Sequence, residues 1–408
     1  MNKIRTVLIT LLLITFSQKG EAQFWKKIKQ KVENKIEKKV NEVLTPKKDS
    51  IKKTPKDKKS PTEKKETKKQ NTGKQLELWT NYDFVPSNNV VFFDTFKDDE
   101  YGAFPARWDI NLGSAEIARL NNEKAFLLND DTSVFPLISN LDFSKRTTIE
   151  LDIYCGEKFW TRYVSNKYRI KLWDKADYFD AYKESFKASK LREIIIQKDG
   201  EVLEVKMGDF GRKINLKNFN NYIEWHHVAI VINGKGLFQL YFDELKMLNL
   251  PKLGVLPTGI TIQEDDFGNQ KSIAMAIKAI KIAQGGNSSY KQIITDGRFV
   301  TNGILFNTGK AKLKPASNGV LKRIKNMLID NPDWKFEIVG HTDSDGEEKN
   351  NLILSQNRAK SVKNALVAMG IAPTRLTILG KGESEPLNTN STPEEKANNR
   401  RVVFILKK

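Results

Sequence analysis

The 408-residue sequence contains one cysteine, Cys155, and three histidines. A single cysteine excludes an intramolecular disulfide, so the folded regions must be held together by core packing. His226 and His227 are neighbours in a strand-like segment, where consecutive side chains point to opposite faces, and His341 lies far from both in the sequence. We therefore expect neither a metal site nor a cofactor.

Long apolar runs are also missing. The run Val7–Phe16 spans ten residues and contains two threonines, whereas a helix that crosses a membrane needs about 20 apolar residues. Lys3 and Arg5 precede this run, and Gly20-Glu21-Ala22 follows it with small residues where a signal peptidase cleaves. Residues 1–22 are therefore predicted to be a cleavable export signal.

The formal net charge of +19 is concentrated in one segment. Residues 23–75 hold 19 lysines against 7 acidic residues, a net charge of +12, and residues 76–408 carry only +5. A basic excess that is confined to one arm does not make the whole protein a nucleic-acid binder. No nucleic-acid partner is expected.

The basic arm divides into two predicted parts. Residues 23–44 form an amphipathic basic helix, because apolar residues recur at intervals of three or four. These residues are Trp25, Ile28, Val32, Ile36, Val40 and Val43. Such a helix suits an outer-membrane or other envelope protein partner, self-association as a short coiled coil, or an anionic membrane surface. Residues 45–80 are rich in lysine, contain three prolines and have very few apolar side chains, which predicts a disordered linker.

Residues 88–285 alternate apolar and polar side chains over many short segments, as strands with one buried face do. The clearest segments are Thr148–Ile153, Tyr168–Trp173, Leu203–Met207 and Trp225–Ile232. Turn-forming sequences such as Asn233-Gly234-Lys235-Gly236 separate the segments. This spacing predicts an all-β, two-sheet sandwich.

Four stretches of this region combine aromatic residues with aspartate, histidine or aliphatic residues. They are Phe93–Phe96, Trp108-Asp109, Trp225–Ala229 and Leu240–Asp243. In these stretches the region resembles the concanavalin A-like or laminin G-like sandwiches. The ligand of the sandwich stays open between a glycan and a protein partner.

The acidic residues of the sandwich bear on whether it could be catalytic. Sandwich glycosidases carry three acids in the pattern E-x-D-x-x-E, and Glu150 and Asp152 match the first two positions. Cys155 occupies the third position, and a thiol cannot replace the carboxylic acid that protonates a leaving group. We therefore expect Glu150 and Asp152 to be solvated outer-face residues and the protein not to be an enzyme. The alternative is a carbohydrate-active enzyme, or a glycan-binding or adhesion protein, that the C-terminal region only localises.

Residues 300–408 alternate between strand and helix patterns. Strands are predicted at residues 304–306, 334–339, 376–379 and 401–406, and helices at 315–330 and 351–369. This order predicts an α+β sandwich of βαβαββ topology, with the helices on one face of the sheet.

Five motifs stand in order along these residues. They are Phe306-Asn307-Thr308-Gly309, Gly340-His341-Thr342-Asp343, Asn351–Ala359 (NLILSQNRA), Gly380-Lys381-Gly382-Glu383 and Asn399-Arg400-Arg401. With these motifs the region resembles the OmpA-like peptidoglycan-binding family over about 105 residues. The resemblance implies that Asp343 and Arg358 hold the ammonium and the carboxylate of diaminopimelate in the peptidoglycan stem peptide. It also implies contributions from Thr342, Asn351 and Arg401 or its neighbour.

The chemistry of these residues suits that role. Asp343 follows a strand in a glycine-containing loop, and Arg358 offers a planar fork for a carboxylate. Asn351 and Arg358 share one helical face, with Asn351 near the helix start. The alternative is a mutual surface salt bridge between Asp343 and Arg358. The sequence thus predicts an exported, non-enzymatic protein of the periplasm that is associated with the outer membrane and the cell wall.

Overall fold

The computed structural model describes residues 82–129, 131–139, 141–155, 166–173, 192–199, 202–215, 225–266, 275–286 and 289–407. The predicted export signal, basic helix and linker lie outside these residues, so these three assignments stay predictions. None of the described helices combines the length and the apolar character that a membrane span requires.

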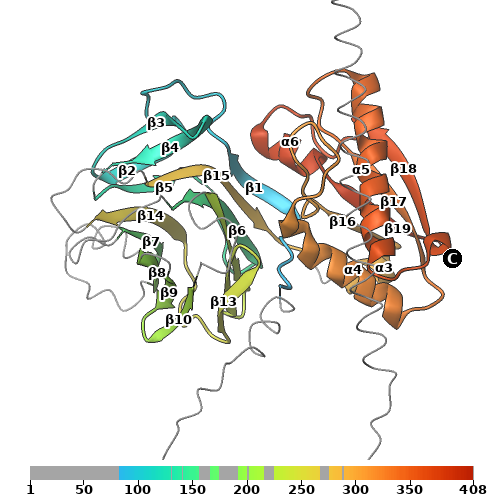
Figure 1. Cartoon of the computed structure of the whole chain (residues 1–408), viewed down its shortest axis with the longest axis horizontal. Helices are drawn as coiled ribbons and strands as arrows, with labels where there is room; N and C mark the ends of the chain where they lie inside the picture. Colours follow the sequence, from blue (N-terminus) through green and yellow to red (C-terminus); the bar gives the residue numbers. More distant parts are fainter. Residues whose placement is uncertain are drawn as a thin grey trace, which may run out of the picture. The chain divides into compact units, whose positions relative to one another are not determined.

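The β-sandwich is built from two antiparallel sheets (Figure 1). The first sheet has the order β13 (Leu245–Leu250), β12 (Phe238–Phe242), β11 (Trp225–Ile232), β6 (Thr147–Tyr154), β15 (Met275–Gln284), β4 (Glu123–Leu128) and β3 (Ala115–Leu120), and β1 (Asn89–Asp94) also pairs with β15. The second has the order β10 (Phe210–Asn215), β9 (Val202–Met207), β8 (Arg192–Asp199), β7 (Asn166–Trp173), β14 (Gly259–Asp266), β5 (Ser133–Pro136) and β2 (Trp108–Leu112). The predicted two-sheet sandwich is confirmed; the narrower resemblance to concanavalin A-like or laminin G-like sandwiches stays a prediction.

Alternating apolar residues fill the space between the two sheets. On β11, Val228, Ile230 and Ile232 are fully buried in the main core, together with Ile170 of β7 and Ile262 of β14 from the second sheet. Because side chains of a strand alternate between faces, the residues between these positions lie on the outer face of the first sheet.

The outer face of the first sheet differs from the prediction. Glu150 is 4% exposed, and its Oε1 lies 2.6 Å from the Nζ of Lys281. The His227 ring bridges the two acids, with Nδ1 2.7 Å from Asp152 Oδ1 and Nε2 3.5 Å from Glu150 Oε2. Glu150 is therefore a buried, ion-paired residue, and the expectation of a solvated residue was wrong for it.

The cause is a segment that precedes the sandwich. Tyr82 and Phe84 are buried against Ala229, Val231 and Tyr241 on this outer face. A face that looks solvent-exposed from strand alternation thus carries a second layer of packing. The alternation itself is correct, since the neighbouring His226 faces the other way and pairs with Asp243.

The C-terminal domain, residues 289–407, contains one four-stranded sheet. Its order is β16 (Arg298–Thr301), β19 (Val402–Lys407), β17 (Lys335–His341) and β18 (Leu376–Gly382); β17 and β18 run parallel, and the other pairs are antiparallel. The helices are α3 (Ser289–Asp296), α4 (Asn318–Asp330), α5 (Glu348–Ala368) and α6 (Pro393–Asn399), with 3-10 turns at Pro315–Ser317 and Pro373–Arg375.

One face of this sheet forms the core with the helices (Figure 1). Phe336 and Ile338 of β17 and Phe404 of β19 pack with Ile324 of α4 and Val362 of α5. The intervening residues of each strand point to the opposite face.

Two predicted elements of this domain are wrong. Residues 304–306 are not a strand, because Phe306 makes only an isolated bridge to Leu313 across a tight turn; the first strand is β16. The predicted βαβαββ order also lacked α6, which lies between the last two strands. Thr392 caps this short helix, since its hydroxyl accepts a hydrogen bond from the backbone N–H of Glu395.

Candidate ligand-binding site

Small residues allow α5 to lie directly on the ends of β17 and β18. A Cβ atom on Gly340 would stand 2.3 Å from the backbone oxygen of Ser355, and one on Gly380 would stand 2.6 Å from the backbone nitrogen of Gln356. Ser355 completes the contact, because its hydroxyl accepts a hydrogen bond of 2.8 Å from the backbone N–H of Gly382. The glycines therefore fix the distance between the strand ends and the helix that carries Arg358.

Asp343 lies in the loop between β17 and α5 and is 8% exposed. The side-chain amide of Asn351, in the first turn of α5, donates to the backbone oxygens of Asp343 (3.3 Å) and Asp345 (3.0 Å) and to Glu383 (2.5 Å). Asn351 is thus brought next to Asp343 as a brace of the loop. Its amide is already engaged within the protein.

Thr342, the neighbour of Asp343, is 3% exposed. Its backbone N–H donates to the oxygen of Gly382, which ties the loop to the end of β18. Its hydroxyl is buried and has no hydrogen-bond partner among the described residues. A buried hydroxyl without a partner is costly, which makes Thr342 Oγ1 a group that a ligand could satisfy.

Arg358 is half-buried on α5 and held by the first motif of the domain. Its guanidinium lies over the Phe306 ring at 5.0 Å, and its Nε donates to the backbone oxygen of Lys310 at 3.2 Å. Burial lowers the pKa of Arg358, the carboxylate of Asp343 opposes that effect, and Arg400 adds to it. Asp343, Arg358 and Arg400 therefore act on one another electrostatically.

Of the two consecutive arginines before β19, Arg400 is the one beside Asp343. The Arg400 guanidinium forms a hydrogen-bonded ion pair with the Asp343 carboxylate. Arg401 points elsewhere: it is 7% exposed and donates to the backbone oxygens of Asn399 (3.3 Å) and Glu385 (2.8 Å). The geometry thus favours the neighbour of Arg401 for contact with a ligand at Asp343.

Arg400 also contacts the sandwich. Its guanidinium lies 5.2 Å from the centre of the Phe93 ring on β1. Beside it, Glu394 of α6 accepts a hydrogen bond from the backbone N–H of Phe93 (2.7 Å) and pairs with Arg107 (2.6 Å). These contacts cover the free edge of β1, which would otherwise expose unpaired backbone groups.

The acids of the sandwich form a different kind of site. Burial raises the pKa of Glu150, but the charge of Lys281 and the hydrogen bond from His227 outweigh it and lower the pKa to about 2. Glu150 is therefore an ionised carboxylate, and the position of the pattern that supplies the general acid is occupied by Cys155. Among the described residues, no group of three or more His, Cys, Asp and Glu side chains is arranged to hold a metal ion.

Comparisons with known proteins concern the C-terminal domain. The OmpA family matches residues 305–400. Outer membrane porin F of Pseudomonas fluorescens is 42% identical over 99 residues, which cover 24% of this chain and 30% of porin F. The peptidoglycan-binding protein ArfA of Mycobacterium bovis is 41% identical over 108 residues, which cover 26% of this chain and 33% of ArfA.

The chain therefore spans about a third of the length of these two relatives. Among solved structures, the cell wall anchor of the T6SS from Pseudomonas aeruginosa is 26% identical, with a TM-score of 0.25; the match covers 29% of this chain and 94% of that one. The family match begins at the turn that holds Arg358 and ends at Arg400, so it includes each charged residue around Asp343. The C-terminal domain of this chain is an OmpA-like domain.

Proposed function

We propose that the C-terminal domain binds peptidoglycan noncovalently through the diaminopimelate of the stem peptide. In this proposal the domain tethers the β-sandwich within the cell envelope and catalyses no reaction. The observation that carries the proposal is the buried carboxylate of Asp343, which has the guanidinium groups of Arg358 and Arg400 in its electrostatic range.

This arrangement suits a zwitterion better than a simple ion. One carboxylate and two guanidinium groups carry a net charge of +1, so a ligand carboxylate is attracted and a ligand ammonium still finds a negative partner. The free end of the diaminopimelate side chain carries both groups on one carbon. Its ammonium would bind Asp343, and its carboxylate would bind Arg358 with help from Arg400, since a guanidinium can donate two parallel hydrogen bonds.

The buried hydroxyl of Thr342 is the fourth proposed contact, because it lies next to Asp343 and lacks a partner among the described residues. Asn351 would act indirectly by holding the loop that presents Asp343. Arg401 is placed outside this contact set, since the guanidinium that pairs with Asp343 is that of Arg400, and Arg401 donates instead to the backbone of Asn399 and Glu385.

The proposed location is the periplasm, in association with the outer membrane and the cell wall. The predicted export signal and the names of relatives such as outer membrane porin F support this location. The non-catalytic role is supported by Cys155, a thiol at the position where the E-x-D-x-x-E pattern requires a carboxylic acid to protonate the leaving group.

Co-sedimentation of the full chain with peptidoglycan sacculi tests the proposal. Wild-type protein is expected to pellet with diaminopimelate-type sacculi. Asp343→Ala and Arg358→Ala are each expected to lower the bound fraction at least tenfold, because a charge-assisted hydrogen bond contributes about 1.5–3 kcal/mol. Lys360→Ala, which removes an exposed charge from the same helix as Arg358, is the matched control and should pellet like wild type.

Lysine-type sacculi form the second arm. Lysine keeps the ammonium but lacks the carboxylate on that carbon, so it offers nothing to Arg358. Binding that is equal for both sacculi, or undiminished in both alanine variants with the fold retained, would refute the proposal.

A further inference from the structure

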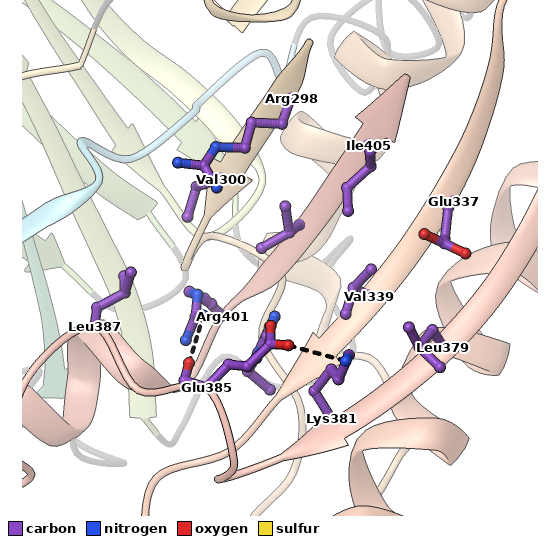
Figure 2. Close-up of a pocket in the computed structure, with 12 residues that line it drawn as sticks. Arg298, Val300, Glu337, Val339, Leu379, Lys381, Glu385, Leu387, Arg401 and Ile405 are labelled. Carbon is purple, nitrogen blue, oxygen red and sulfur yellow. Dashed lines mark hydrogen bonds and ion pairs between the residues drawn. The ribbon is translucent and has the colours of Figure 1, made fainter. Parts of the chain in front are cut away.

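The face of the C-terminal sheet that is turned away from the helices is hollowed by a cavity of about 320 Å³ (Figure 2). Outward-facing residues of all four strands line it. Its aliphatic residues are Val300, Val339, Leu379, Val403 and Ile405 of the strands and Leu387 of the segment before α6. Val339 and Val403 are 3% and 6% exposed, so this face is a shaped site and not a flat solvated surface.

Charged side chains surround the aliphatic residues, and their pairing leaves a positive excess. Lys381 pairs with Glu385 at 2.9 Å (Figure 2), and Glu337 pairs with Lys407 at 2.9 Å. The exposed guanidinium of Arg298 forms no hydrogen bond or ion pair with the described residues. The guanidinium of Arg401 is a further positive group on the cavity wall, beside Arg298 and the paired Lys381.

Two polar groups at the cavity are buried without partners. His341 is 4% exposed, and its Nδ1 has no hydrogen-bond partner in the described part of the chain; Arg401 is 7% exposed, and its Nε also lacks one. Both side chains line the cavity. Buried nitrogens without partners are uncommon in native proteins and require an explanation, such as a ligand that satisfies them.

We propose that this cavity binds a small amphiphilic anion, with a carboxylate or phosphate held by Arg298 and Arg401 and an aliphatic chain on the valine, leucine and isoleucine residues. The lining is aliphatic and positive, which matches such a ligand in both respects. At about 30 Å³ for each water-sized group, a cavity of 320 Å³ holds about ten non-hydrogen atoms. That is the size of octanoate. The site is separate from the one at Asp343, which involves the helix-facing side of the domain.

The ionisation of His341 agrees with this use. Burial lowers the pKa of His341 to about 4, the charges of Arg401 and Lys381 add to the effect, and Glu385 opposes it. The ring is therefore neutral at pH 7 and does not compete with Arg298 or Arg401 for the anion. A bound anion would favour the protonated ring, so it would raise the pKa of His341 towards its ordinary value.

Methyl NMR of the full chain, labelled at Ile, Leu and Val, tests the proposal with four probes: octanoate, octyl phosphate, 1-octanol and inorganic phosphate. Millimolar octanoate or octyl phosphate is expected to shift the methyl signals of Val339, Val403 and Ile405 in a saturable way. The anion with the lower dissociation constant identifies the preferred head group. 1-Octanol should bind at least tenfold more weakly, and inorganic phosphate should leave these methyl signals unchanged.

Arg298→Ala supplies the mutational arm, because this side chain is exposed and forms no hydrogen bond or ion pair with the described residues. It should weaken binding of the octyl anion about fivefold, as expected for one partly exposed charge pair, and leave co-sedimentation with peptidoglycan unchanged. Lys360→Ala on α5 is the matched control and should bind the anion like wild type. The proposal is overturned by an absence of saturable shifts with both octyl anions, by shifts confined to methyl groups outside the cavity, or by an unchanged affinity in Arg298→Ala.

Discussion

Replacing Gly340 by alanine tests how the strand end and α5 position the anchor site. The added Cβ would stand 2.3 Å from the backbone oxygen of Ser355, whereas an ordinary contact needs at least 3.4 Å. Backbone atoms of a packed helix cannot rotate away, so α5 must move by about 1 Å. Overpacking of this kind costs about 1–3 kcal/mol. Arg358 is part of α5, whereas Asp343 lies in the loop after β17. The same movement therefore changes the distance between these two side chains.

Two measurements separate these effects. Hydrogen exchange of the β17 and α5 amides should show local stability reduced by about 1–3 kcal/mol. Affinity for diaminopimelate-type peptidoglycan fragments should fall about tenfold, since a displacement near 1 Å can cost that much in a preorganised site. Thr377→Ala, at an exposed position of neighbouring β18, is the control and should change neither quantity. Wild-type exchange and wild-type affinity in Gly340→Ala would show that the contact between Gly340 and α5 does not position the site.

Three further predictions concern stability. Lys281→Ala leaves the carboxylate of Glu150 buried without its closest ion-pair partner, so the free energy of unfolding should fall by about 3–5 kcal/mol. A loss under about 1 kcal/mol in denaturant titration would contradict the pairing. Burial lowers the pKa of His227, but hydrogen bonds to Asp152 and Glu150 raise it to about 10 from 6.5. The folded state thus holds more protons, and thermal stability should fall as the pH rises from about 6.5 to about 10, a slope that His227→Gln should flatten. Arg375 donates to three carbonyl oxygens, one in the last turn of α4, one at its C-cap and one at Trp334. Arg375→Ala should therefore lower the free energy of unfolding by about 1–3 kcal/mol in the same titration. An unchanged midpoint would argue against this capping role.

Sequence periodicity predicted the strands of the sandwich and most of the C-terminal domain. The segment Trp225–Ile232 was placed to the residue, because alternation over eight residues is a strong local signal. The short helix α6 was missed although its signal was present: Thr392, Pro393 and Glu395 form a capping sequence. A seven-residue helix has too few turns to show an apolar period.

Burial that depends on distant segments could not be predicted in this way. Glu150 lies on the outer face, as alternation requires, yet the packing of Tyr82 and Phe84 on that face makes it a second buried layer. The sequence also did not determine which of the two consecutive arginines contacts Asp343. Arg400 precedes β19, so strand alternation did not settle which guanidinium reaches Asp343.

In the proposed site, the opposite charges of Asp343 and Arg358 hold one zwitterionic carbon of the ligand. Isothermal titration of the full chain with two soluble stem peptides, identical except for diaminopimelate or lysine at the third position, tests it most directly. We expect at least tenfold tighter binding of the diaminopimelate peptide, and a loss of that preference in Arg358→Ala. Equal affinity of wild-type protein for both peptides would contradict it.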